Sequence, residues 1–168
     1  MKKRPIFLLS LACVFLSFAI LPISCKKKTI GALEPALPAE TQTGARTFGC
    51  LVNGEIWIPT GISMIPAITT SIQFDILSLK TNKGVEAVNF SVTNMQTVGS
   101  YDLITNSNFV RYIYDTNIYK CTDGTLVITK YDKINRIISG HFFFVGKDSA
   151  TGKTIKITEG RFDVPFTN

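Results

Sequence analysis

The stretch TFGCLVNGEIWI, residues 47–58, contains the clearest fold signal in the chain. Its two apolar runs flank Asn53-Gly54, the strongest short-range signal for a β-hairpin with a two-residue loop. Such a loop pairs Cys50 with Trp57 and turns both side chains toward the same face of the hairpin. Apolar residues also occupy the opposite face, so this hairpin is expected to be covered on both sides.

The same alternation with a period of two continues from Arg46 to the end of the chain, and turn residues interrupt it about every 8–12 positions. Further strands are expected at residues 71–79, 85–93, 109–115, 125–130, 137–145, 154–158 and 160–166. The Pro- and Gly-containing stretch 59–70 is expected to be a loop. Residues 46–168 therefore predict one all-β domain, an antiparallel sandwich or open barrel of about eight or nine short strands.

The N-terminal residues have the three parts of an export signal. Three basic residues precede an apolar run at 6–20, which is shorter than the ~20 residues of a membrane-spanning helix. Ser24 directly before Cys25 resembles the bacterial lipobox, in which the chain is cut before the cysteine and its thiol carries lipid. We therefore expect a signal peptide at 1–24, followed by the lipidated Cys25 and a flexible tether at 25–45.

The net charge of +6 belongs to the N-terminal segments and not to the predicted domain. Six of the 18 Lys and Arg residues lie at 2–4 and 26–28, which leaves residues 29–168 with 12 basic and 12 acidic residues. A nucleic-acid-binding domain carries a basic excess on its folded body, so nucleic acid is not an expected partner. The basic run after Cys25 instead fits lipid headgroups beside a membrane anchor.

Two motifs and one hairpin resemble an uncharacterised family of Bacteroidota lipoproteins that contain a domain of unknown function. TFGCLVNG at 47–54 resembles the start of that domain, and GRFDV at 160–164 resembles its end. TLVITKYDKINRIISG at 125–140 is similar to its penultimate hairpin, and the resemblance covers roughly residues 41–166. The resemblance implies export, lipidation and a β-rich body, and it brings no established activity with it.

The residues after Cys25 also bear on location. In such bacteria, acidic residues at this place mark lipoproteins for the outer surface, and here Lys26, Lys27 and Lys28 stand instead. We therefore expect a cell-envelope protein on the periplasmic face of the outer membrane, attached through the lipid on Cys25.

Two cysteines remain in the predicted domain after the signal peptide and Cys25 are set aside. Cys50 and Cys121 could form a disulfide in an exported protein, closing a loop of about 70 residues. They could equally be two separate buried thiols, which behave as small hydrophobic side chains. The sequence leaves both alternatives open, because it does not give the Cα separation.

Other chemistry is weakly supported. The chain has a single histidine, His141, and no paired cysteine spacing. We therefore expect no metal site, no cofactor site and no catalytic triad. Isolated acidic residues such as Glu86 are expected at outward or turn positions. Asp148-Ser149-Ala150 resembles the O-glycosylation site of exported Bacteroidota proteins, with Ser149 as the acceptor, and an ordinary turn is the alternative.

Aromatic residues are the remaining candidates for a contact surface. Trp57, Tyr112, Tyr114 and Phe143 could stack against sugar rings or another protein, or could simply pack between strands. Phe143 stands where the resembled family usually has a polar residue, which predicts a more apolar outer face.

The function expected from these features is a non-catalytic binding or interaction module with an unknown protein or small ligand as its partner. An alternative is a small-ligand carrier, which requires a barrel cavity of about 300 Å³ or more. A third alternative is a hydrolase that uses two carboxylates, which distant strands can bring together.

Overall fold

The computed structural model describes residues 36–105 and 107–168, and these residues form strands and turns without a helix. The predicted signal peptide and Cys25 lie outside the described residues. The ten strands are β1 (Thr47–Val52), β2 (Glu55–Trp57), β3 (Ile68–Gln73), β4 (Ile76–Lys83), β5 (Glu86–Val92), β6 (Gly99–Asp102), β7 (Phe109–Tyr114), β8 (Asn117–Asp132), β9 (Ile137–Asp148) and β10 (Thr154–Pro165). The predicted all-β antiparallel class is confirmed.

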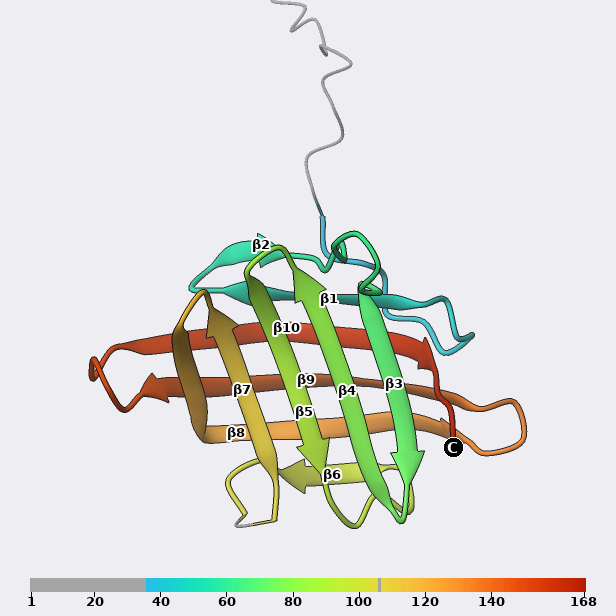
Figure 1. Cartoon of the computed structure of the whole chain (residues 1–168). Helices are drawn as coiled ribbons and strands as arrows, with labels where there is room; N and C mark the ends of the chain where they lie inside the picture. The colour runs from blue at the N-terminus through green and yellow to red at the C-terminus, as the bar shows by residue number, and fades with distance from the viewer. Residues whose placement is uncertain (1–35, 106) are drawn as a thin grey trace, which may run out of the picture. The chain divides into compact units, whose positions relative to one another are not determined.

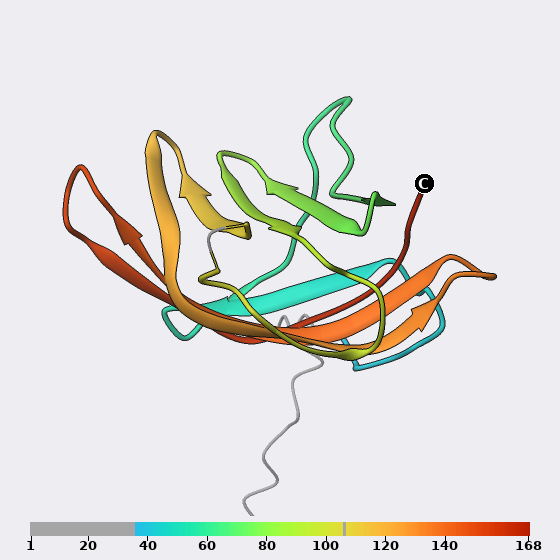
Figure 2. The same cartoon turned by 90° about the horizontal axis from the view of Figure 1, so that it is seen from below.

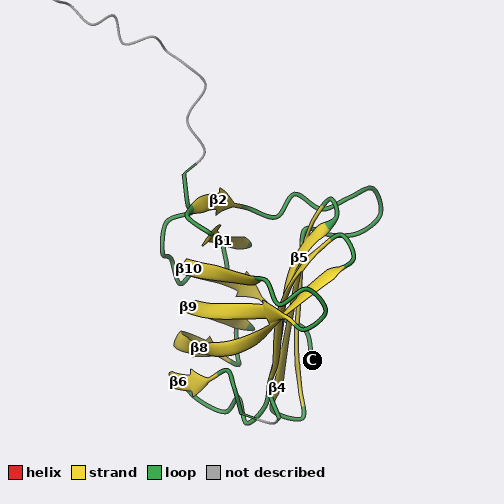
Figure 3. Ribbon diagram, turned by 90° about the vertical axis from the view of Figure 1, so that its left-hand side faces the viewer, coloured by secondary structure: helices red, strands yellow, loops and turns green. Residues whose placement is uncertain are grey.

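All ten strands belong to one sheet that curls into a half-barrel. The strand order is β2-β1-β10-β9-β8-β7-β5-β4-β3, and β6 pairs with β8. Figure 1 shows β3, β4, β5 and β7 crossing in front of β8, β9 and β10. Figure 2 shows the same curl from below, and Figure 3 shows it from the side. The structure therefore decides between the two predicted architectures in favour of an open barrel.

Two of the three long strands, β8 and β10, contain bulges where their register shifts. β8 shifts register between Cys121 and Asp123 and again between Ile128 and Lys130. β10 shifts between Ile157 and Gly160, where Glu159 has a φ of 50°. Such bulges bend a strand and increase its twist, so one sheet can wrap around its own core.

The interior of the half-barrel is filled by aromatic side chains. The ring of Phe142 lies 4.8 Å from that of Phe90 and 5.4 Å from that of Phe48, and all three side chains are buried. Phe144 and Phe162 extend this cluster on either side. Aromatic rings from β1, β5, β9 and β10 therefore pack the middle of the half-barrel.

The strand predicted at 71–79 is wrong, because a hairpin divides it into β3 and β4. Gln73 pairs with Ile76, and the two residues between them, Phe74 and Asp75, have φ values of 51° and 58°. Positive φ at both central positions defines the turn that fits a twisted hairpin, and Gly or Asn usually supplies it. Phe74 and Asp75 give no such signal in the sequence.

Other elements also differ from the prediction, and β8 extends well beyond the strand expected at 125–130. The expected loop at 59–70 ends earlier, because β3 begins at Ile68. The two strands expected at 154–158 and 160–166 are one strand, β10, which the bulge only bends. β6 was not predicted, and its four residues are mostly exposed and lack apolar alternation.

Residues 41–45, predicted as the end of the flexible tether, are held against the sheet by the buried carboxylate of Asp163. Its oxygens accept hydrogen bonds from Oγ1 of Thr41 (2.6 Å) and from the backbone N–H groups of Thr43 (2.9 Å), Gly44 (2.8 Å) and Ala45 (3.1 Å). Oγ of Ser139 donates a further bond of 2.7 Å.

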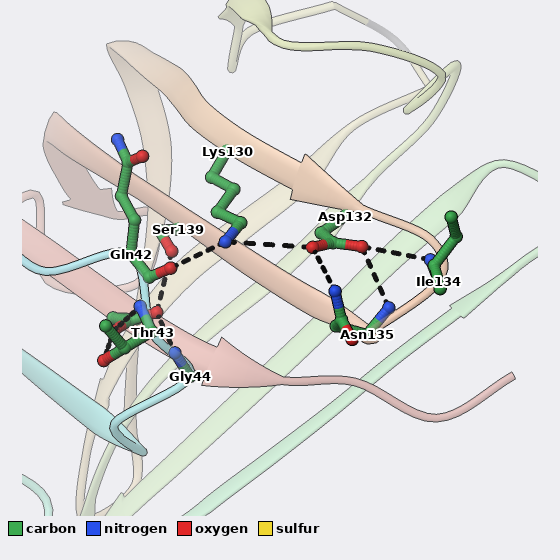
Figure 4. Close-up of polar contacts among 9 residues, drawn as sticks. Gln42, Thr43, Gly44, Lys130, Asp132, Ile134, Asn135 and Ser139 are labelled. Atoms are coloured by element: carbon green, nitrogen blue, oxygen red, sulfur yellow. Dashed lines mark hydrogen bonds and ion pairs between the residues drawn. The ribbon is translucent and has the colours of Figure 1, made fainter.

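A second contact holds the same segment from β8. Nζ of Lys130 donates to the carbonyl oxygen of Gln42 at 2.8 Å and also lies 3.8 Å from Asp132 (Figure 4). The folded domain therefore begins before residue 46, the boundary that composition indicated.

Candidate functional site

A polar pocket of about 360 Å³ opens at the rim of the half-barrel. The β1–β2 hairpin, the turn between β4 and β5, and the end of β7 surround it. Its lining consists of Val52, Asn53, Glu55, Ile56, Trp57, Lys83, Glu86, Tyr112 and Tyr114. Three separate parts of the chain thus contribute polar or aromatic groups to one opening.

Strand register places these groups together. Lys83 and Glu86 are paired at the base of the β4–β5 turn, and Glu86 is paired with Tyr114 on the neighbouring β7. Tyr112 lies two residues from Tyr114 and therefore points to the same face of the sheet. Trp57 reaches this group from the hairpin, where it is paired with Cys50 as predicted.

The carboxylate of Glu86 is the centre of the pocket. Its Oε2 accepts hydrogen bonds from Nε1 of Trp57 at 2.7 Å and from the hydroxyl of Tyr112 at 2.6 Å. Within the described part of the chain, no hydrogen bond is found to its Oε1. The two donors fix the carboxylate in place, and Oε1 retains the capacity to accept a bond from a ligand.

The donors themselves are buried. Trp57 is 2% exposed and Tyr112 is 4% exposed. Burial, together with the hydrogen bond to Glu86, raises the pKa of Tyr112 far above its usual range, so its hydroxyl remains a donor. Burial and the two hydrogen bonds therefore hold this part of the site in place without a ligand.

The mouth of the pocket is more accessible than its floor. Tyr114 is half exposed, and Glu55 is exposed at the start of β2. Nζ of Lys83 lies 6.0 Å from the centre of the Trp57 ring. One ammonium group, two carboxylates and an exposed aromatic ring suit a small polar ligand with several hydroxyl or amino groups.

Cys50 lies under the pocket and is fully buried. Burial raises the pKa of its thiol to about 12, although the nearby Lys83 acts in the opposite direction. A thiol with this pKa is protonated at neutral pH and is a poor nucleophile or metal ligand.

The candidate disulfide between Cys50 and Cys121 is not formed, and both residues are free cysteines. Cys50 lies on β1 and Cys121 on β8, with β10 and β9 between them. Neighbouring strands are about 4.8 Å apart, whereas a disulfide requires Cα atoms within about 7 Å. Burial raises the pKa of the Cys121 thiol to about 11.

The predicted aromatic surface is only partly brought together. Trp57, Tyr112 and Tyr114 meet in the pocket, but the first two form its buried floor and not an exposed platform. Phe143 lies on β9 between the core residues Phe142 and Phe144, so it points to the opposite, outer face and is 47% exposed. It is not part of this site.

Ser149 lies in the turn between β9 and β10 and is exposed. The preceding Asp148 is buried and accepts hydrogen bonds from the N–H of Ala150 and from Oγ1 of Thr151, both at 2.9 Å. These bonds lower the pKa of Asp148 and give it a structural role in the turn. Glycosylation of Ser149 stays a prediction.

The charged residues of the pocket, Glu55, Lys83 and Glu86, were not predicted as site residues from the sequence. The expectation that Glu86 lies at an outward or turn position is wrong, because its carboxylate points to Trp57 and Tyr112. The only local signal was its place just after the Asn82-Lys83-Gly84 turn.

Among the described residues, no group of three or more His, Cys, Asp or Glu is arranged to hold a metal ion. No helix there is long and apolar enough to cross a membrane.

Comparison with known protein families gives one match. A family model described as a domain of unknown function (DUF6252) matches residues 47–165, from the start of β1 to the end of β10. No curated protein and no solved structure matches the chain.

Proposed function

We propose that this chain, which belongs to the DUF6252 family, is a non-catalytic binding module held at the cell envelope by a lipid on Cys25. The observation that supports a binding role is the carboxylate of Glu86, fixed by Trp57 and Tyr112 at the floor of an open pocket. The pocket takes a small hydroxylated ligand such as a monosaccharide or an amino sugar. Glu86 accepts a hydrogen bond from the ligand, and Tyr114 stacks against its ring.

The pocket chemistry favours binding over catalysis. Cys50 is protonated beneath the site, and His141 lies on β9, outside the pocket lining. One oxygen of Glu86 is already occupied by two strong donors, which suits a fixed acceptor better than a group that transfers protons.

The single tryptophan of the chain provides a direct test of this site. Titration with glucosamine and with glucose is expected to shift the fluorescence of Trp57, because its indole forms the floor of the pocket. Tyr114→Ala should weaken the binding at least about tenfold by removing the stacking ring. Phe109→Ala changes another exposed ring on β7, outside the pocket, and should leave the affinity unchanged. A Trp57 signal that neither sugar moves would contradict the proposed ligand class.

A carboxylate hydrolase is the second candidate, because Glu55 and Glu86 line the same pocket. Retaining and inverting glycosidases both require such a pair. Incubation with nitrophenyl glycosides separates the two functions. The binding module should release no nitrophenol, whereas hydrolysis that either Glu55→Gln or Glu86→Gln abolishes would establish the enzyme instead.

Lipid attachment is expected to depend on one residue. In cells, the protein should fractionate with membranes and incorporate a labelled fatty acid, and Cys25→Ser should lose the label, because the lipid is attached to that thiol. Cys121→Ser is the control and should keep the label. Digestion by protease added to intact cells would contradict the periplasmic placement.

A further inference from the structure

Two adjoining pockets lie along the seam where β3 meets the strands β1 and β10. The first has a volume of about 230 Å³ and is lined by Arg46, Pro66, Ala67, Ile68, Thr70, Val164 and Pro165. The second has a volume of about 220 Å³ and is lined by Ala36, Pro38, Arg46, Thr47, Phe48, Ile58, Pro59, Ala67 and Ile68. Because they share Arg46, Ala67 and Ile68, we treat them as one site, the seam pocket.

The seam is fixed by backbone contacts at the end of the chain. Ser71 of β3 forms a parallel bridge with Thr167, and the N–H of Ile72 donates to the carbonyl oxygen of Thr167 at 2.8 Å. Figure 1 shows β3 crossing the C-terminal end of β10 at this place. The walls of the seam pocket therefore belong to strands that are already held together.

Most of the seam pocket is apolar, and one polar atom in its wall stands out. Thr70 is 6% exposed, and its Oγ1 is buried without a hydrogen-bond partner among the described residues. Its inward position follows from β3, where Thr70 and Ile72 are buried and their neighbours are not. Because this oxygen has almost no accessible surface, the wall that Thr70 presents to the pocket is apolar.

Arg46 provides the charge at the rim. Its side chain is exposed, and the described residues give its guanidinium neither an ion pair nor a hydrogen bond. Its φ of 58° is in the left-handed region, which Arg adopts rarely. The preceding N–H groups of Gly44 and Ala45 bind Asp163, and this fixes the chain that leads into Arg46. The guanidinium is thus a free, planar donor beside an apolar pocket, the arrangement that recognises a carboxylate.

We infer that the seam pocket binds a small molecule with a short apolar chain and one carboxylate. The chain packs against Pro66, Ile68 and Val164, and the carboxylate lies at the rim within reach of Arg46. Thr70 forms part of the wall against which the apolar chain lies. This site is separate from the polar pocket and does not depend on the function proposed for it.

Hexanoate and hexanol are the matched probes, since they differ only in the charged end. In the full chain, hexanoate is expected to shift the methyl NMR signals of Ile68 and Val164 in a saturable way. Hexanol should bind at least about tenfold more weakly, a difference that a charged hydrogen bond readily supplies. Absence of any saturable shift with hexanoate would overturn the inference.

Two arginine variants distinguish the contribution of the Arg46 charge to binding from that of the apolar lining. Arg46→Gln should weaken hexanoate about tenfold and leave hexanol unchanged, because only the anion loses a partner. Arg136→Gln is the matched control, since Arg136 is also exposed and has a φ of 55° in another turn. Equal affinities for hexanoate in the two variants would show that Arg46 does not bind the carboxylate.

Thr70→Val keeps the shape of the wall and removes only a hydroxyl that the ligand does not reach, so it should leave hexanoate affinity unchanged. Tyr114→Ala should leave hexanoate affinity unchanged, which shows that the seam pocket and the polar pocket are distinct. Competition between hexanoate and a sugar for one site would contradict this separation.

Discussion

Replacing Asp163 by Asn is expected to lower the free energy of unfolding by about 3 kcal/mol and to release residues 36–45 from the sheet. The carboxylate is 1% exposed and is surrounded by donors, namely the side chains of Thr41 and Ser139 and three consecutive backbone N–H groups. An amide offers one acceptor oxygen and turns its own N–H₂ toward donors. Urea unfolding measures the stability, and limited proteolysis detects the released segment.

Two variants separate this effect from a general loss of charge. Asp132→Asn alters a carboxylate in an exposed turn, where it accepts hydrogen bonds from Ile134 and Asn135, and it should cost less than about 1 kcal/mol. Ser139→Ala removes one of the donors to Asp163 and should cost about 1 kcal/mol. A proteolysis pattern of Asp163→Asn identical to that of the unchanged protein would refute the role assigned to Asp163.

The same carboxylate predicts the pH dependence of stability. Burial alone would raise the pKa of Asp163, but the hydrogen bonds from Thr41, Ser139 and the backbone outweigh burial and hold it far below its ordinary value. The stabilisation is therefore complete above the unfolded pKa of about 4 and is lost as the pH falls toward the folded value. Between pH 6 and pH 3, the urea midpoint should fall more steeply in the unchanged protein than in Asp163→Asn.

The parts of the fold that the sequence predicted correctly depend on local signals. Asn53-Gly54 specifies a hairpin with a fixed register, and the structure has the expected pair of Cys50 and Trp57. Alternation along single strands predicted the all-β class in the same way. The turn at Phe74-Asp75 was missed because its backbone conformation is imposed by the pairing of β3 with β4 and not by residues that favour it.

The candidate site was predicted only in part because it depends on pairing between distant strands. Tyr112 and Tyr114 were recognised as aromatic candidates, but their partner Glu86 comes from β5, and this pairing skips β6. Whether Glu86 points inward depends on the residue at which β5 begins, and a shift of one residue reverses it. The hydrogen bonds between Asp163 and residues 41–45 were not predicted for a similar reason, because they join the two ends of the domain.

Phe142→Ala is expected to lower the free energy of unfolding by about 4 kcal/mol, because it removes the ring on which both halves of the curled sheet pack. This ring contacts those of Phe48 on β1, Phe90 on β5 and Phe162 on β10. Phe143→Ala is the matched control, since the neighbouring side chain is 47% exposed on the outer face and should cost less than about 1 kcal/mol. Equal losses of stability in the two variants would refute the central role of Phe142.

Gly160 on β10 provides a second test of the role of Phe142. The two residues are paired, and the ring of Phe142 lies over the glycine, which has no side chain. A Cβ at position 160 would clash with the ring of Phe142, so Gly160→Ala should be strongly destabilising alone. In the Phe142→Ala background the ring is gone and the added methyl group occupies part of the space. The two substitutions should therefore cost clearly less together than the sum of their separate effects, by about 1 kcal/mol or more. Strictly additive losses in urea unfolding would mean that the bulge in β10, and not the ring of Phe142, requires a glycine at this position.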